Sequence, residues 1–166
     1  MVQMSQYHVK VAAEAFAAGF FAQAGCDVSI QYGADQPAYD LIIARGKSIR
    51  KVSVKGSQTG SWGLIQSYLQ NADYHAAAEA WSAHQDRNII VCLVQFKNVA
   101  IGEPPRAYLA TPQEIADHLK RECRGRGNTI LYEKRCWSAR ARGAGTTDQI
   151  PAEWRFSIDR LEQRMR

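Results

Sequence analysis

The sequence predicts an α/β fold, because patterns typical of helices alternate with patterns typical of buried strands. Residues 5–24 are rich in alanine, and their apolar residues recur at helical spacing. Residues 87–96 include a continuous apolar run, which is typical of a strand buried on both faces of a sheet. Between them, residues 39–43 and 52–55 have the pattern of two strands joined by a short turn.

Length and composition predict one domain that does not enter a membrane. The chain has 166 residues, of which 46% are hydrophobic and 22% are charged, as in ordinary globular proteins. Its strongly apolar run near residues 89–96 is far too short to span a bilayer, and its N-terminus lacks the pattern of a signal peptide. We therefore expect a cytoplasmic protein with one domain over residues 1–166, in which residues 140–166 form a loop and a short helix docked on the core.

The cysteines predict neither a zinc site nor a redox motif. There are four of them, with no C-x-x-C pair and no zinc spacing. Cys26 and Cys92 lie in expected strands, where they would act as small buried apolar residues. A disulfide between Cys123 and Cys136 is left open.

The first helix is expected over residues 5–24, with Ser5 as its cap and Gly25 as its stop signal. Its core-facing stripe is expected to contain Val9, Ala13, Phe16 and Phe20. Glu14 lies beside this stripe. If it has no functional role, it is expected to be a solvated carboxylate at the edge of the stripe.

The remaining elements follow from local patterns of apolar, capping and turn residues. Strands are expected at 26–32, 87–96, 106–110 and 128–132. Helices are expected at 71–83, 111–121 and 157–164, and loops at 33–37, 56–61 and 140–147, the last of them mobile.

The two strands around residues 39–55 are expected to form a hairpin with polar residues at one end. With the turn at residues 45–48 and its centre between Lys47 and Ser48, antiparallel pairing would set Asp40 opposite Lys55 and Ile42 opposite Ser53. A slip of one residue would break this register. In the expected register an aspartate, a serine and a lysine converge at the end of an otherwise apolar hairpin.

These residue types suit metal-dependent hydrolysis. Asp40 could hold a divalent cation such as Mg²⁺, which prefers oxygen ligands, and the Val54 carbonyl and Glu14 could supply further oxygens. Lys55 could orient an attacking water or stabilise developing charge, and Ser53 could hold a ligated water. The alternative is a surface cross-strand pair that contributes roughly 0.2–1 kcal/mol.

The order of elements resembles that of the PD-(D/E)XK nuclease superfamily over most of the chain. A helix with Glu14 precedes a strand, the Asp40 strand, the Ser53-Val54-Lys55 strand, a helix and a buried strand. This is similar to small endonuclease-like members with the core E…D…(E/Q)-x-K, and residues 150–157 also resemble their closing segment. The resemblance implies a restriction endonuclease-like fold, in which helices flank a central mixed sheet.

The resemblance also implies metal-dependent hydrolysis of phosphodiester bonds, mostly in DNA, with Mg²⁺ or Mn²⁺ as cofactor. Asp40 would match the metal-binding carboxylate, Lys55 the catalytic lysine, and Glu14 the acid on the first helix. Gln58 would match the polar residue found just past the lysine in some members. Because many such small nucleases cut two strands as dimers, a homodimer is compatible with it.

Two departures from the family pattern affect the expected chemistry. Tyr39 stands where the family has a proline, and Ser53 stands where an acid or glutamine is usual. Some restriction-type members carry serine there and supply an acid from a following helix, for which Asp73 and Glu79 are the candidates. The alternative function is therefore a catalytically inactive nuclease-fold module that binds DNA or a protein partner.

Positive charge is concentrated in one segment, which favours a polyanionic partner. The chain carries a net charge of +5, whereas the segment from 120 to 142 alone has eight basic and two acidic residues. The expected phosphate-binding residues are Lys120, Arg121, Arg124, Arg126, Lys134, Arg135, Arg140 and Arg142. The alternative is a solvated basic face without a partner. Tryptophans at 62, 137 and 154 could stack on bases, although core roles are more common.

Overall fold

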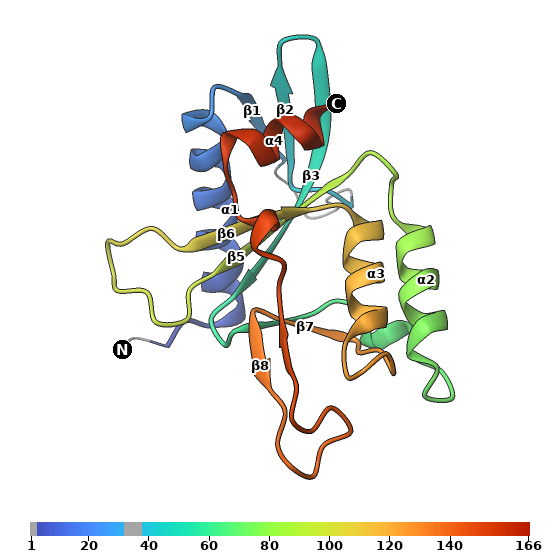
Figure 1. Ribbon diagram of the computed structural model, residues 1–166. Coiled ribbons are helices and arrows are strands. Elements are labelled where there is room, and N and C mark those ends of the chain that lie inside the picture. Colours follow the sequence, from blue (N-terminus) through green and yellow to red (C-terminus); the bar gives the residue numbers. More distant parts are fainter. Residues whose placement is uncertain (1–2, 32–37) are drawn as a thin grey trace. The chain divides into compact units, whose positions relative to one another are not determined.

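A computed structural model describes residues 3–31 and 38–166, which form two compact units. Unit 1 comprises the described residues 3–31 and 38–59 together with 88–111 and 152–166, and unit 2 comprises residues 60–87 and 112–151 (Figure 1). The expected loop at 33–37 and the end of the first expected strand at Tyr32 lie outside the described residues. The single domain over 1–166 stays a prediction.

Unit 1 is built on a mixed five-stranded sheet, which confirms the α/β class with a central mixed sheet. Its strands run in the order β1-β2-β3-β5-β6, and all neighbours are antiparallel except β3 and β5. All six residues of β5 are buried, as its continuous apolar run predicts. The strands are β1 (Asp27–Ile30), β2 (Leu41–Arg45), β3 (Ser48–Ser57), β5 (Ile90–Gln95) and β6 (Arg106–Ala110).

Helix α1 (Gln6–Gln23) packs its small residues against this sheet. Ser5 caps it, and the Ser5 hydroxyl accepts the N–H of His8 at 3.2 Å. The predicted core stripe is correct at Val9 and Ala13 but continues through Ala17 and Phe21, because fully buried residues recur at every fourth position. Phe16 and Phe20 are only partly buried.

Helix α4 (Ile158–Met165) contributes to the same apolar core as α1. Its cap, Ser157, accepts the N–H of Arg160, as the sequence predicts. Leu161 and Met165 join the core, and the buried Arg160 donates through Nε to the Leu109 carbonyl at 2.9 Å. Before α4, a short 3₁₀ turn, η2 (Ala152–Trp154), leads to Phe156, whose N–H bonds the carbonyl of Ala107 in β6.

The predicted register of the β2–β3 hairpin is wrong by two residues. Arg45 pairs with Ser48, so the turn consists of Gly46 and Lys47, with Gly46 at a φ of 61°. Asp40 precedes β2 and is not paired in the ladder: its N–H donates to the carbonyl of Val52, which pairs with Leu41, so Asp40 does not lie opposite Lys55. Ser53 and Lys55 keep their expected common face of β3, because a shift of two residues preserves the alternation of side chains.

Unit 2 contains two packed helices and two small antiparallel sheets. Helix α2 (Tyr74–His84) begins three residues later than predicted, after its cap Asp73, which accepts the N–H of Ala76, and it packs against α3 (Pro112–Arg121). The sheets pair β4 (Ser61–Gly63) with β7 (Ile130–Tyr132), and β8 (Lys134–Cys136) with β9 (Thr147–Gln149). A 3₁₀ turn, η1 (Gln66–Tyr68), follows β4.

Three loop and cysteine predictions have definite outcomes. The expected loop at 56–61 is wrong at its start, because β3 continues through Ser57. The expected loop at 140–147 consists of turns up to Thr146, and β9 begins at Thr147. Cys123 and Cys136 are both free thiols, so the disulfide left open by the sequence does not form here. No helix within residues 3–31 and 38–166 is long and apolar enough to cross a bilayer.

Candidate functional site

Asp40 is fixed at the start of β2 by hydrogen bonds to the backbone of β3. Its own N–H donates to the Val52 carbonyl at 2.8 Å, and its Oδ2 accepts the N–H of Val54 at 2.7 Å. The carboxylate thus takes the position of a strand carbonyl that the ladder would otherwise require. This contact holds it against the backbone between Ser53 and Lys55.

Ser53 and Lys55 share one face of β3, because they are two residues apart in a regular strand. Ser53 is 5% exposed, whereas Lys55 is exposed. Asp40 is held beside both of them, because it bonds the backbone of Val52 and Val54, the residues on either side of Ser53. The N–H and C=O of one strand residue point to the same edge, so the Val54 carbonyl points toward the Asp40 side of β3.

Glu14 reaches this end of the hairpin because α1 crosses β3 closely at Gly56. A Cβ added to Gly56 would lie 2.8 Å from the side chains of both Ala13 and Val9. Only glycine allows this approach, and the residue after Ala13 is Glu14. The sequence suggests that small residues after Lys55 admit a ligand to the backbone, but at Gly56 the neighbour is α1.

The charges of Glu14, Asp40 and Lys55 interact. Burial raises the pKa of Glu14 above its usual range, and the nearby Asp40 carboxylate raises it further. Lys10 and Lys55 oppose these effects and lower the same pKa. The Nζ of Lys10 lies 3.8 Å from Oε1 of Glu14. The structure therefore brings together three of the predicted site residues from α1, β3 and the start of β2.

The donor atoms at this place fit a hard divalent cation. The Oε1 atom of Glu14 is inaccessible to solvent and accepts no hydrogen bond from the described part of the chain. Two carboxylates and the Val54 carbonyl supply only oxygen, which Mg²⁺ and Mn²⁺ accept while keeping several waters. Among the described residues, no group of three or more His, Cys, Asp or Glu side chains is placed to hold a metal. A metal here would have few protein ligands.

Gln58 is engaged with the segment that precedes α1. Its Oε1 accepts the N–H of Met4 at 3.0 Å, and its Nε2 donates to the Met4 carbonyl at 2.6 Å. This reciprocal pair ties the N-terminal end of α1 to the end of β3. Its observed contacts position the helix that carries Glu14, a structural use that the sequence does not suggest.

The two candidates for a migrated acid both have partners inside unit 2. Asp73 caps α2 through its bond to the Ala76 N–H at 2.9 Å. Glu79 lies in an ion pair with Lys120 at 3.6 Å. Both carboxylates therefore have a structural role within unit 2.

The eight predicted phosphate-binding residues all lie in unit 2, but their surroundings differ. Lys120 is paired with Asp117 at 3.1 Å as well as with Glu79. Arg126 is partly buried against the ring of Tyr74. Arg124 donates to the carbonyl of Ala144 at 2.6 Å. The remaining cations are exposed: Arg121, Lys134, Arg135, Arg140 and Arg142.

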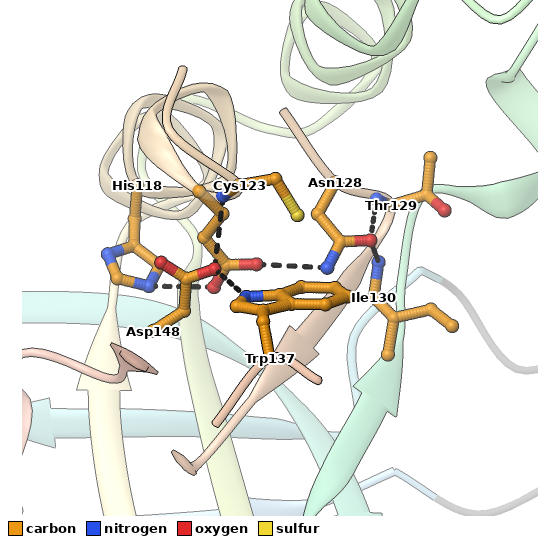
Figure 2. Close-up of polar contacts among 8 residues, drawn as sticks. His118, Cys123, Asn128, Thr129, Ile130, Trp137 and Asp148 are labelled. Carbon is orange, nitrogen blue, oxygen red and sulfur yellow. Dashed lines mark hydrogen bonds and ion pairs between the residues drawn. The ribbon is translucent and has the colours of Figure 1, made fainter. Parts of the chain in front are cut away.

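A buried polar network in unit 2 is absent from the sequence-based predictions (Figure 2). Glu122, 2% exposed, lies 3.0 Å from Nε2 of His118 and accepts the amide of Asn128 at 3.1 Å. Burial raises the pKa of Glu122, and Asp148 on β9 raises it further, against the lowering effect of His118. Only the i, i+4 spacing of His118 and Glu122 was visible in the sequence. Asp148 joins them through a long-range contact that no local pattern encodes.

Comparisons of the chain with protein-family models, with curated proteins and with solved structures found no match.

Proposed function

We propose that this protein is a metal-dependent endonuclease that hydrolyses phosphodiester bonds in DNA, with a PD-(D/E)XK-type site at the start of β2. The observation that carries the proposal is the hydrogen bond from the Val54 N–H to Oδ2 of Asp40 at 2.7 Å, which fixes this carboxylate on β3 next to Lys55. Helix α1 crosses β3 at Gly56, so Glu14 lies near the same place, and its carboxyl is influenced by the charges of both Asp40 and Lys55. Perturbed carboxylates with a specific charged neighbour are characteristic of functional sites.

The arrangement of unit 1 supports the finer proposal of a restriction endonuclease-like fold. The chain passes through α1, β1, β2, β3, α2 and β5 in the order that the resemblance implies. Strands β1, β2 and β3 are antiparallel neighbours, and β5 adds in parallel to β3. In this order the proposed metal-binding carboxylate precedes β2, and the proposed catalytic lysine lies on β3.

Each site residue has a distinct proposed role. Asp40, Glu14 and the Val54 carbonyl would hold Mg²⁺ or Mn²⁺, with Asp40 oriented by its bond to the Val54 N–H. When bound, such an ion supplies a water of lowered pKa and offsets negative charge on the phosphate. Lys55 is exposed and would orient the attacking water or stabilise the charge that develops on the phosphate oxygens. Ser53 would hydrogen-bond a water of the site.

A second candidate function is a catalytically inactive nuclease-fold module that binds DNA or a protein partner. The observation that favours it is the serine beside Asp40, which leaves two carboxylates where the family pattern has more. Asp73 and Glu79 are both engaged inside unit 2. With fewer anionic ligands, metal affinity would be lower.

Plasmid cleavage separates the two functions. Purified protein is incubated with supercoiled plasmid and Mg²⁺ or Mn²⁺, beside Lys55→Ala and Asp40→Asn. Lys47→Ala is the matched control, because it removes an exposed lysine from the opposite end of the same hairpin. The endonuclease proposal predicts that wild type and the control nick the plasmid and the two site variants do not. Equal activity of wild type and Lys55→Ala would defeat it.

A further inference from the structure

A hairpin of unit 2 carries a group of exposed cations that form no ion pair within the described part of the chain. We define the basic hairpin as residues 134–149, which comprise β8, the turns at its tip and β9. Its four basic side chains are Lys134, Arg135, Arg140 and Arg142, and all are exposed. In the described chain, none of the four forms an ion pair with a carboxylate. This distinguishes them from Lys120, which is paired twice.

The guanidinium of Arg135 is held in the corner between two aromatic rings. Its Cζ lies 4.6 Å from the ring centroid of Tyr132 and 4.6 Å from that of Trp137. The two rings meet edge to face, with centroids 6.2 Å apart and an interplanar angle of 78°. Cation–π contact orients the planar group while leaving its N–H edges available for hydrogen bonds. Such preorganisation reduces the entropy lost when an anion binds.

Trp137 is held by contacts within unit 2 that compete with base stacking. Its indole N–H donates to Oδ2 of Asp148 at 2.5 Å, and the same oxygen accepts the N–H of Cys123 at 3.0 Å (Figure 2). A Cβ added to Gly143 would lie 2.8 Å from ring atoms of Trp137, so the backbone of the tip packs against the indole. Arg135 lies over the indole and Gly143 packs against it, so a base that stacked on Trp137 would compete with these contacts.

The basic hairpin is attached to the C-terminal end of α3 both at its tip and through β9. Arg124, just after α3, donates to the Ala144 carbonyl at the tip, and Asp148 joins β9 to the same end of α3. Next to this attachment, Glu122 and Asn128 form the buried contact that organises the chain before β7. The cations are therefore displayed on a scaffold with few internal degrees of freedom.

We propose that the basic hairpin binds the phosphodiester backbone of duplex DNA, with Arg135 as its anchor and without stacking on bases. Exposed cations without ion pairs suit phosphates, and the contacts that Arg135 and Gly143 make with the indole compete with the stacking used by single-strand binders. The inference rests on DNA as the substrate of the proposed function and names the surface that would contact it. It selects four of the eight residues that the sequence marks as phosphate-binding, and it excludes Trp137 as a base-stacking residue.

The test is DNA binding without metal, measured by fluorescence anisotropy on a labelled duplex in EDTA at several salt concentrations. The variant Lys134→Gln/Arg135→Gln/Arg140→Gln/Arg142→Gln removes the four charges, and Lys47→Gln is the control for an exposed lysine elsewhere. Each lost phosphate contact lowers the slope of log K against log salt by about 0.9, so the quadruple variant should lose up to about 3.6. Its affinity at low salt should fall roughly tenfold or more.

Single variants keep the inference testable if the quadruple variant folds poorly. Arg135→Gln should lower both affinity and salt slope, whereas Arg135→Lys keeps the charge and should lower affinity while largely retaining the slope. An unchanged slope for Arg135→Gln and the quadruple variant, or an equal loss for Lys47→Gln, would overturn the inference. Tighter binding to single strands that depends on the base would overturn it as well.

The outcome is separable from that of the endonuclease proposal. Loss of binding in the hairpin variants of a protein that never cuts plasmid supports the hairpin and defeats the nuclease. The opposite result is metal-dependent cutting that Lys55→Ala loses, while the hairpin variants bind DNA as wild type does. It would support the endonuclease proposal and overturn the hairpin inference. Asp40→Asn should bind duplex DNA as wild type does in EDTA, because it leaves the hairpin unchanged.

Discussion

Oδ2 of Asp40 accepts the backbone N–H of Val54 at 2.7 Å, so this carboxylate closes the start of the β2–β3 ladder as well as marking the candidate site. A structural role and a proposed chemical role coincide in one side chain. Substitutions at Asp40 must therefore be chosen so that the two roles can be separated.

The variants Asp40→Asn and Asp40→Ala should differ in the free energy of unfolding, but both should lose cleavage. Asp40→Asn keeps an oxygen that accepts the Val54 N–H, whereas Asp40→Ala removes the acceptor at a cost of about 1–2 kcal/mol in the free energy of unfolding. Urea unfolding measures this difference, with Asn expected nearer to wild type. Metal-dependent cleavage should be lost in both. Equal destabilisation by the two variants would show that the hydrogen bond does not matter for folding.

Gly56→Ala should displace α1 from the sheet. The added methyl would meet Ala13, Val9 and the Val9 carbonyl within 2.8–3.0 Å, and the backbone carbonyl cannot move alone. Overpacking of this kind typically costs about 1–3 kcal/mol. Because the same crossing places Glu14 at the site, cleavage should fall even at temperatures where the variant is folded.

Gly19→Ala is the matched control for this substitution, because a Cβ at Gly19 meets nothing within 4 Å. It should leave the free energy of unfolding unchanged or raise it slightly, since alanine favours the helix by up to about 1 kcal/mol. Equal thermal unfolding of Gly56→Ala and Gly19→Ala would contradict the close crossing of α1 and β3.

Gln58→Ala should loosen the segment before α1 without removing any group from the carboxylate pair. Loss of both bonds to Met4 should reduce hydrogen-exchange protection in the first turn of α1. Gln58→Glu retains an acceptor for the Met4 N–H but cannot donate to its carbonyl, so it should show an intermediate effect. If Gln58→Ala abolished cleavage with wild-type exchange rates, a direct catalytic role would replace the positioning role.

Glu122 should make the stability of the protein depend on pH. Burial raises its pKa in the folded state above the ordinary 4.5, so the native chain holds this proton more tightly than the unfolded chain does. Its contribution to the free energy of unfolding should then decrease as pH rises from about 4.5 through the raised value. The groups facing it are His118 on α3, Asn128 and, on β9, Asp148.

The measurement is urea unfolding across this pH range for wild type and Glu122→Gln. As pH rises, the unfolding free energy of wild type should decrease relative to that of Glu122→Gln, because glutamine does not lose a proton. Glu103→Gln, at an exposed position, should show a constant difference from wild type. A constant difference for Glu122→Gln too would mean that the buried carboxyl is not coupled to folding.

Some of this arrangement could be predicted from local patterns, because apolar residues repeat every two residues in a strand and nearly every four in a helix. Alternation was enough to place Ser53 and Lys55 on one face of a strand, and the spacing of Val9 and Ala13 to face a helix toward the core. Register could not be predicted, because it depends on whether the turn is centred between Gly46 and Lys47, as observed, or one residue later, and the local residues allow both. The contacts of Gln58 with Met4 and of Asp148 with Cys123 join distant segments, so no local pattern encodes them.

The most direct test of the central claim is anomalous diffraction at the manganese edge from crystals soaked in Mn²⁺, with Asp40→Asn crystals as the control. The account predicts an anomalous peak between the Asp40 carboxylate, the Val54 carbonyl and Glu14 in the wild type, and no peak there in Asp40→Asn. Manganese bound elsewhere while this position stays empty in the wild type would contradict it.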